Sequence, residues 1–115
     1  MHRGDLVLVD LEPVRGGEAD KRRPAVVVSN DRANWTAARL GRGTVTVVPV
    51  TSNTSRVLAF QVLLSAAATG LEHDSKAQAE QVRSIDVEGL GAVMGHLPAG
   101  LMDDVDRALR LHLQL

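Results

Sequence analysis

Basic, hydroxyl and carboxyl side chains of this 115-residue chain gather at the ends of its apolar runs and within one of them. Lys21-Arg22-Arg23 precedes the second run, Thr51-Ser52-Asn53 follows the third, and Glu80-Gln81-Val82-Arg83-Ser84 lies in the fifth. Guanidinium groups stay charged and form forked hydrogen bonds to phosphate oxygens, and hydroxyls suit the same ligand. The combination predicts a phosphodiester site. Taken alone, the basic triplet is also typical of a solvated loop, and Thr51 of a β-former at a strand end.

Other chemistries lack the residues that they need. The chain has no Cys, which excludes disulfides, thiolate zinc sites and a Cys nucleophile. No two of the four histidines lie three to five residues apart, so the sequence has no local zinc motif. Gly41-x-Gly43 lacks the further glycines of a phosphate loop, and no serine has the context of a catalytic triad. We therefore expect neither a metal nor a small-molecule cofactor.

The charge of the chain is nearly balanced but unevenly spread. The chain has thirteen basic and fourteen acidic residues, and this balance argues against a generic nucleic-acid coat protein. The only aromatic residues besides histidine are Trp35 and Phe60, too few for an extended base-stacking platform. Residues 1–60 hold nine basic and six acidic side chains, whereas residues 61–115 hold four and eight. A local positive site fits within a neutral total, and we predict that the first half supplies it.

The length and the apolar runs limit the organisation of the chain. One domain over residues 1–115 is expected from the length. The N-terminal residues include no long apolar segment of the kind found in a signal peptide. The longest apolar runs, such as residues 25–28, are far too short to span a bilayer. We expect a cytoplasmic protein without a membrane partner, which the absence of Cys allows.

Apolar patterning predicts a mainly β domain. Pro49 lies inside the third predicted strand and indicates an edge position or a bulge. Within the fifth strand, alternation predicts that Glu80 and Val82 share one face and that Gln81 and Arg83 share the other. Residues 12–23 are polar, with Pro13 and a Gly pair, and predict a loop. The expected strands are residues 6–9, 24–29, 44–51, 59–64, 75–85 and 92–97.

Two helices complete the expected architecture. Residues 31–40 predict a short helix that is capped by Asn30 or Asp31 and ended by the glycines at 41 and 43. The clearest helix follows Pro98, where apolar residues recur every three or four positions; His112 falls on their side and is expected to pack there. Five or six short antiparallel strands with a C-terminal helix suit a compact barrel or a strongly twisted sheet.

Four blocks of the sequence carry a further signal. They are Arg3-Gly4-Asp5-Leu6-Val7-Leu8-Val9-Asp10-Leu11-x-Pro13, Gly17-Glu18 with Arg23-Pro24-Ala25-Val26-Val27-Val28-Ser29-Asn30-Asp31, Val48-Pro49-Val50-Thr51-Ser52, and Glu80-Gln81-Val82-Arg83-Ser84-Ile85-Asp86. In this order, and over nearly the whole chain, the blocks resemble the MazF/PemK toxin family.

The resemblance implies a fold and a function. The fold would be a small SH3-like antiparallel β-barrel of the MazF/CcdB type with a C-terminal α-helix. The function would be that of the toxin of a type II toxin–antitoxin pair, a homodimeric endoribonuclease that cleaves single-stranded RNA without a metal and so inhibits translation and growth. The ribose 2′-OH would attack, leaving a 2′,3′-cyclic phosphate and a 5′-OH end. The implied partner is a MazE-like antitoxin with an acidic, disordered segment.

The resemblance also assigns roles to residues of this chain. Arg23 and Thr51 occupy the catalytic positions: Arg23 would bind the scissile phosphate and help to protonate the leaving oxygen, and Thr51 would donate a hydrogen bond to the phosphorane. The general base is left open, because an arginine is normally charged. The expected RNA-contacting residues are Glu18, Ser52, Ser75, Glu80 and Gln81, with the carboxylates accepting from base amino groups.

The sequence departs from the family pattern in the fourth block. Some relatives carry a basic residue at the position of Gln78, and others have Asp where Glu80 stands. The catalytic assignment therefore depends on Arg23 and Thr51.

Two other functions remain open. A CcdB-like toxin poisons gyrase without cleaving RNA, typically with bulky C-terminal residues, whereas this chain ends Leu111-His112-Leu113-Gln114-Leu115 without Trp. A non-catalytic RNA-binding barrel is the third hypothesis, and the scarcity of aromatic residues disfavours it. The bases at which RNA is cut do not follow from the sequence.

Overall fold

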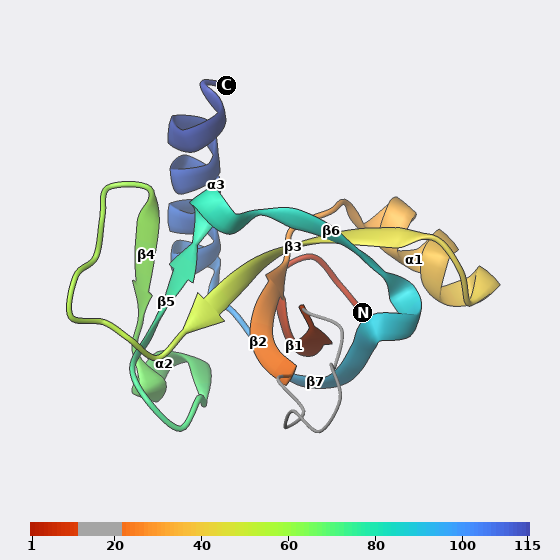
Figure 1. The fold of residues 1–115 in the computed structure, drawn as a ribbon, viewed down its shortest axis with the longest axis horizontal. Coiled ribbons are helices and arrows are strands. Elements are labelled where there is room, and N and C mark those ends of the chain that lie inside the picture. Colours follow the sequence, from red (N-terminus) through yellow and green to blue (C-terminus); the bar gives the residue numbers. More distant parts are fainter. Residues whose placement is uncertain (12–21) are drawn as a thin grey trace, which may run out of the picture.

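A computed structural model describes residues 1–11 and 22–115. These residues form seven strands, three α-helices and two 3-10 turns (Figure 1). In chain order the elements are β1 Asp5–Asp10, β2 Arg22–Val27, α1 Asp31–Leu40, β3 Thr44–Thr51, β4 Gln61–Leu64, α2 Ala66–Thr69, β5 Ser75–Gln78, η1 Ala79–Gln81, β6 Arg83–Asp86, η2 Val87–Gly89, β7 Leu90–His96 and α3 Ala99–Leu113.

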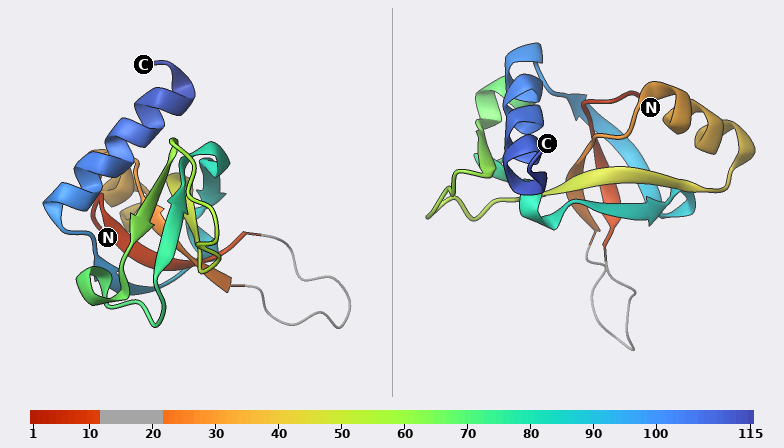
Figure 2. Two further views of the ribbon diagram at one scale, coloured as in Figure 1. Left: turned by 90° about the vertical axis from the view of Figure 1, so that its left-hand side faces the viewer. Right: turned by 90° about the horizontal axis from the view of Figure 1, so that it is seen from above.

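The strands form one antiparallel, open sheet with the order β4-β5-β3-β2-β1-β7, and β6 also pairs with β3. The long strand β3 is the centre of this arrangement. One of its edges pairs with β2, and its other edge pairs first with β6 over residues 44–47 and then with β5 over residues 50–51. Helix α3 runs along one side of the sheet and contacts β4 and η1 (Figure 2). The expected mainly β architecture with a C-terminal helix is confirmed.

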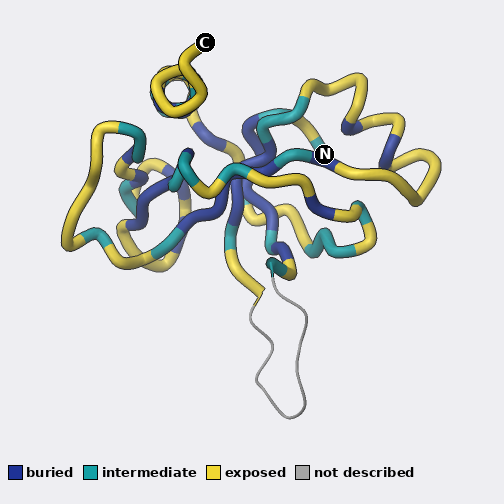
Figure 3. Tube along the Cα trace, turned by 45° about the horizontal axis from the view of Figure 1, so that its top comes forward, coloured by how far each residue is buried: buried dark blue, intermediate teal, exposed yellow. Residues whose placement is uncertain are grey.

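Strands β1, β2 and β3 contribute to apolar clusters on both faces of the sheet, which explains their nearly continuous apolar runs. Val26 and Val48 face one apolar cluster, which α3 covers with Val105 and Ala108. Ala25, Val27 and Val47 face a second cluster, which α1 covers with Ala37. Alternate residues of a strand point to opposite faces, so the same three strands serve both clusters. Buried chain is concentrated in these central strands (Figure 3).

Pro49 was expected at an edge position or a bulge; β3 is an interior strand, so the edge alternative was wrong, but the ladder on one side of β3 is interrupted at Pro49. The last β3 residue paired with β6 is Val47, opposite Arg83, and the first paired with β5 is Val50, opposite Ala77. Pro49 therefore lies where β3 changes partner on that side. A residue without an N–H is tolerated where the ladder on one side of its strand is interrupted.

The expected strand over residues 75–85 was also wrong in part, because it is two strands joined by η1. Ala79 is buried in the cluster beneath α3, so the chain turns inward to bury it. Glu80 thus lies in a 3-10 turn and does not share a strand face with Val82.

The helix predictions were largely confirmed. Helix α1 has the expected bounds: the Asn30 side chain accepts the Ala33 N–H at 2.8 Å, and Gly41 ends the helix with a φ of 65°. Pro98 is the residue that caps α3. The short helix α2 was not predicted. His112 is exposed, and its ring centroid lies 6.1 Å from that of Phe60. No helix in the described part of the chain is long and apolar enough to cross a membrane.

Candidate active site

Two cavities open where β2 and β3 emerge from the sheet. The larger has a volume of about 400 Å³ and is lined from β2, β3, β5, η1 and β6. The smaller, of about 240 Å³, lies toward the segment that leads into β5. Arg23, Val50 and Thr51 line both cavities. The two cavities therefore meet at these residues, and we refer to them together as the cleft.

Strand register explains why Arg23 and Thr51 come together. Ala25 pairs with Pro49 in the antiparallel ladder between β2 and β3. Continuing this register by two residues on each strand brings Arg23 level with Thr51. Residues opposite each other in an antiparallel pair point to the same face. The two predicted catalytic residues, 28 positions apart in the sequence, thus line one surface.

The hydroxyl of Thr51 is oriented by the turn that follows β3. Its Oγ1 accepts the Asn53 N–H at 3.3 Å. The Asn53 side-chain oxygen accepts in turn from the Ser55 N–H at 3.2 Å and from the Ser55 hydroxyl at 2.8 Å. Because Thr51 is an acceptor in its bond with Asn53, its own hydroxyl proton stays available for a ligand in the cleft.

The larger cavity is electropositive. Arg23 and Arg83 contribute guanidinium groups to its wall, and Gln78 and Gln81 contribute amides. Its described lining includes no carboxylate. Arg83 comes from the second half of the chain, so the prediction that the first half supplies the positive site holds only in part. Gln81 and Arg83 line the same cavity, although Gln81 belongs to η1 and not to a strand.

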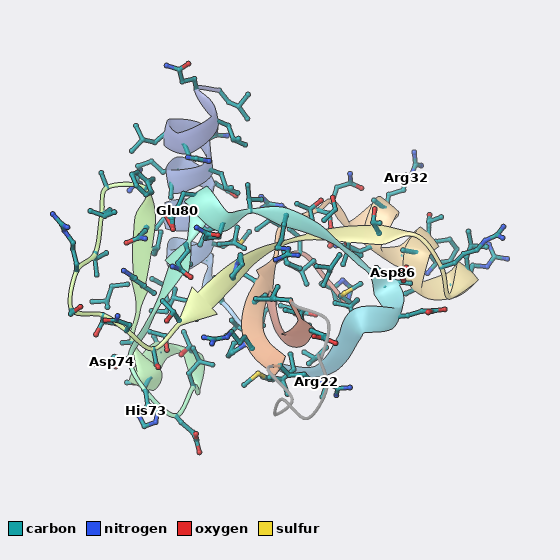
Figure 4. All side chains as sticks on the ribbon, viewed as in Figure 1. Arg22, Arg32, His73, Asp74, Glu80 and Asp86 are labelled. Carbon is teal, nitrogen blue, oxygen red and sulfur yellow. The ribbon has the colours of Figure 1, made fainter. Side chains whose placement is uncertain are left out.

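Ser52 and Ser75 line the smaller cavity with Glu72 and His73. Ser52 is exposed, whereas Ser75 is buried and its hydroxyl donates to the His73 carbonyl at 2.9 Å. Glu72 and His73 were not predicted as site residues. No motif marks them, because they reach the cleft through the course of the loop between α2 and β5, where Figure 4 labels His73.

Glu80 lies beside the cleft and does not line either cavity. Both of its carboxylate oxygens accept from Gln61 Nε2, at 2.9 and 3.0 Å. Gln61 Oε1 accepts the Leu58 N–H at 2.9 Å. Glu80 thus ties η1 to β4 and to the loop before it. Glu18, the remaining predicted contact, lies outside the described residues.

Arg83 was also missed as a site residue, although it stands in the fourth block of the resemblance. A signal for Arg83 was present in the sequence, because it lies two residues after Gln81 and was predicted to share a face with it. Among residues 1–11 and 22–115, no three His, Asp or Glu side chains come close enough together to hold a metal ion. The cleft offers guanidinium, hydroxyl and amide groups, together with the Glu72 carboxylate and the His73 imidazole in its smaller cavity.

Comparison with known proteins extends the resemblance found in the sequence. A family model described as the PemK-like, MazF-like toxin of type II toxin–antitoxin systems matches residues 2–113. The chain belongs to this family. Over its whole length it is 61% identical to endoribonuclease MazF9 of Mycobacterium tuberculosis, of which it covers 98%. It is 36% identical over 114 residues to endoribonuclease EndoA of Bacillus subtilis, covering 98% of this chain and 94% of that one.

The solved structures agree with this assignment. A MazE–MazF structure from Deinococcus radiodurans matches all of this chain and 97% of that chain, with a TM-score of 0.78 and 28% identity. With the family model and the full-length relatives, this makes the chain a MazF-family toxin endoribonuclease.

Proposed function

We propose that the cleft cleaves single-stranded RNA at specific sequences without a metal ion. The ribose 2′-OH attacks the adjacent phosphorus and loses its proton, and the bond from phosphorus to the 5′ oxygen breaks as that oxygen gains one. The products carry a 2′,3′-cyclic phosphate and a 5′-OH. The single observation that supports this proposal best is that Arg23 and Thr51 line the junction of two cavities, which leaves room for a nucleotide on each side of a phosphate.

Arg23 and Thr51 suit the charge that develops in this reaction. A guanidinium at the phosphate neutralises its oxygens and donates toward the leaving 5′ oxygen. The Thr51 hydroxyl donates to an equatorial oxygen of the phosphorane, a contribution of about 2.7–4 kcal/mol for one well-placed donor. Holding the 2′-OH in line with the leaving oxygen provides a further part of the rate enhancement.

The remaining predicted residues would read the bases that flank the cut. Gln81 in the larger cavity and Ser52 and Ser75 in the smaller one offer hydrogen-bonding groups to bases or to the backbone. Glu18 and Glu80 would accept from base amino groups. Because Glu80 already accepts from Gln61, we propose that it acts from a fixed position beside the larger cavity.

We further propose the partners and the setting that accompany this activity. Residues 1–115 form a single toxin domain that acts as a homodimer in the cytoplasm and inhibits translation and growth. The larger cavity, with two arginines, is complementary to an acidic antitoxin segment, which would block RNA by occupying the same wall. A MazF from D. radiodurans has been solved with MazE, which makes a MazE-like antitoxin the partner to seek.

Incubation of the purified protein with a single-stranded RNA in EDTA tests the proposal. We expect cleavage that yields 5′-OH ends, and no cleavage of the same oligonucleotide with a 2′-deoxyribose at the cut site. Arg110→Ala, which removes an exposed arginine from α3, serves as the control and should cut as the wild type does. Cleavage of the deoxy substrate would contradict the 2′-OH mechanism, and RNA binding without cleavage would favour a non-catalytic barrel.

A further inference from the structure

Helix α1 presents a basic and aromatic stripe away from the cleft. Arg32, Trp35 and Arg39 follow the spacing i, i+3 and i+7, which places them on one side of a helix. The residues that α1 buries, Asn34 and Ala37, lie on the opposite side. We call the stripe, together with Arg42 just beyond the helix, the α1 outer face.

The exposure of Trp35 is costly for the free protein. Its side chain is 61% exposed, the largest exposed fraction for an aromatic residue in the described chain. The guanidinium carbon of Arg39 lies 5.2 Å from the centre of the Trp35 ring, a cation–π contact. Arg39 therefore holds the ring in place and leaves the rest of it open to a ligand.

Interactions within α1 do not account for all of the positive charges on the α1 outer face. A cation is favourable in the last turn, as with Arg39, but unfavourable in the first turn, where Arg32 stands. Among the described residues, none of the three arginines Arg32, Arg39 and Arg42 has an ion-pair partner. The neighbouring Asp31 carboxylate instead accepts the Arg3 N–H at 2.6 Å. Arg39 thus contacts the exposed ring, Arg32 lies one turn before it on the same side of the helix, and Arg42 follows the helix end.

The position of the α1 outer face separates it from the cleft. Helix α1 lies at the end of the molecule's long axis opposite to β4 and β5 (Figure 1). The Arg32 side chain points away from the sheet (Figure 4). Of the acidic residues at the end of β6 and just after it, Asp86 accepts the Glu88 N–H at 2.9 Å, and Glu88 lines a cavity with Ala38 of α1.

We propose that the α1 outer face binds single-stranded RNA beyond the nucleotides held in the cleft. An unpaired base stacks on Trp35, and its flanking phosphates contact Arg32, Arg39 and Arg42, a combination used by single-strand binders. The choice of RNA as ligand rests on the proposed function. Binding at this second place raises the local concentration of a long substrate at the cleft, and a short substrate does not benefit.

Trp35 itself reports on this binding, because the chain has one Trp and no Tyr. The probe is a fully 2′-O-methylated single-stranded RNA of about 20 nucleotides, long enough to exceed the single-strand site sizes of small folds. We expect saturable quenching of Trp35 fluorescence. The double variant Arg32→Gln/Arg39→Gln should bind the labelled probe about 10-fold more weakly, and its salt dependence should fall by about 1.4 in log–log slope for two lost phosphate contacts.

A matched variant controls for general electrostatics. Arg107→Gln/Arg110→Gln removes two exposed arginines from α3 and should change the affinity less than about 2-fold, since neither faces the proposed ligand. Equal weakening by both double variants would overturn the proposal, as would an absence of quenching or equal quenching by duplex RNA. A concentration-dependent change of Trp35 emission without RNA, together with a larger particle in solution, would instead make this face a protein interface.

The outcome separates this proposal from that for the cleft. The Arg23→Ala variant should lose cleavage while its Trp35 is still quenched by the long probe. Normal cleavage of a short RNA without quenching by the long probe would overturn the α1 proposal alone. Quenching without any RNA cleavage by the wild type would support it and overturn the proposed function.

Discussion

Two groups of charged residues lie on the same sheet and differ in whether their charges are internally paired. In the cleft, Arg23 and Arg83 line the larger cavity, whose described lining holds no carboxylate. At the other end of β1, Arg3 donates to the Val28 carbonyl at 2.9 Å and to the Asp106 carboxylate. Asp5, the neighbour of Arg3 in the first block, is likewise engaged.

The Arg3–Asp5 cluster, which comprises Arg3, Asp5, His96 and Asp106, is bonded within the protein. Asp5 Oδ2 accepts the His2 N–H at 2.8 Å, and Asp5 Oδ1 lies 2.7 Å from His96 Nδ1. Paired charges of this kind hold the N-terminal strand, β7 and α3 together, whereas unpaired charges in a cavity are available to a ligand. The comparison predicts that mutations in the cleft lower activity and that mutations in the cluster lower stability.

Arg23→Ala should give the largest effect. Loss of the guanidinium that contacts the scissile phosphate is expected to lower the cleavage rate about 10³-fold, the upper range for removal of one transition-state donor. The variant should keep the circular dichroism spectrum and the unfolding midpoint of the wild type, because Arg23 is exposed. Full activity would remove Arg23 from the site. A lower unfolding midpoint would mean that Arg23, like Arg3, stabilises the fold.

Thr51→Val should lower the cleavage rate about 10²-fold, because it removes the hydroxyl and keeps the β-branched shape. Thr51→Ser is the matched variant and should retain most of the activity, since it keeps the donor. The measurement is single-turnover cleavage of a short RNA. If both variants cut equally slowly, the methyl group and not the hydroxyl is what Thr51 contributes.

The site was predictable to the extent that it depends on strand register. Thr44–Thr51 was predicted with its observed bounds because a run of β-branched residues is a local signal. Once β2 and β3 pair as neighbours, Arg23 and Thr51 must come near each other. The capping of α1 by Asn30 and Gly41 is equally local and was equally predictable.

The features around residue 80 could not be predicted from the sequence, because they depend on contacts between distant segments. The turn at η1 exists because Ala79 is buried beneath α3, and α3 begins 20 positions later in the chain. The bond that holds Glu80 comes from Gln61, 19 positions away. Neither partner leaves a local pattern in the sequence around residue 80, so alternation predicted a strand there.

Arg3→Ala should act on stability and leave catalysis unchanged. It removes a charge-assisted bond to Asp106 and a bond to the Val28 carbonyl, and both partners are partly exposed. We expect the free energy of unfolding to fall by about 1–2 kcal/mol, less than for a fully buried charged bond. Urea unfolding measures the loss, and cleavage at a temperature where the variant is folded should match the wild type. Lower activity at full occupancy of the folded state would contradict the division between the two regions.

The smallest effect is expected in the pH dependence of stability. Burial raises the pKa of Asp5, but the His2 N–H, the His96 imidazole and the positive charge at Met1 outweigh it, so the pKa of this carboxyl is lowered. A lowered folded-state pKa means that the ionised form is favoured by folding. The contribution is therefore complete above the unfolded-state pKa of about 3.9 and is lost as the pH falls through the folded-state value.

Asp5→Asn removes this titration and keeps the shape of the side chain. We expect the difference in unfolding free energy between wild type and variant to shrink as the pH falls below about 4. Unfolding in urea at a series of pH values measures it, with Asp10→Asn, an exposed residue of the same strand, as the control. A difference that grows on acidification would mean that Asp5 is held protonated in the fold. The Arg3–Asp5 cluster would then not be the ion-paired counterpart of the cleft.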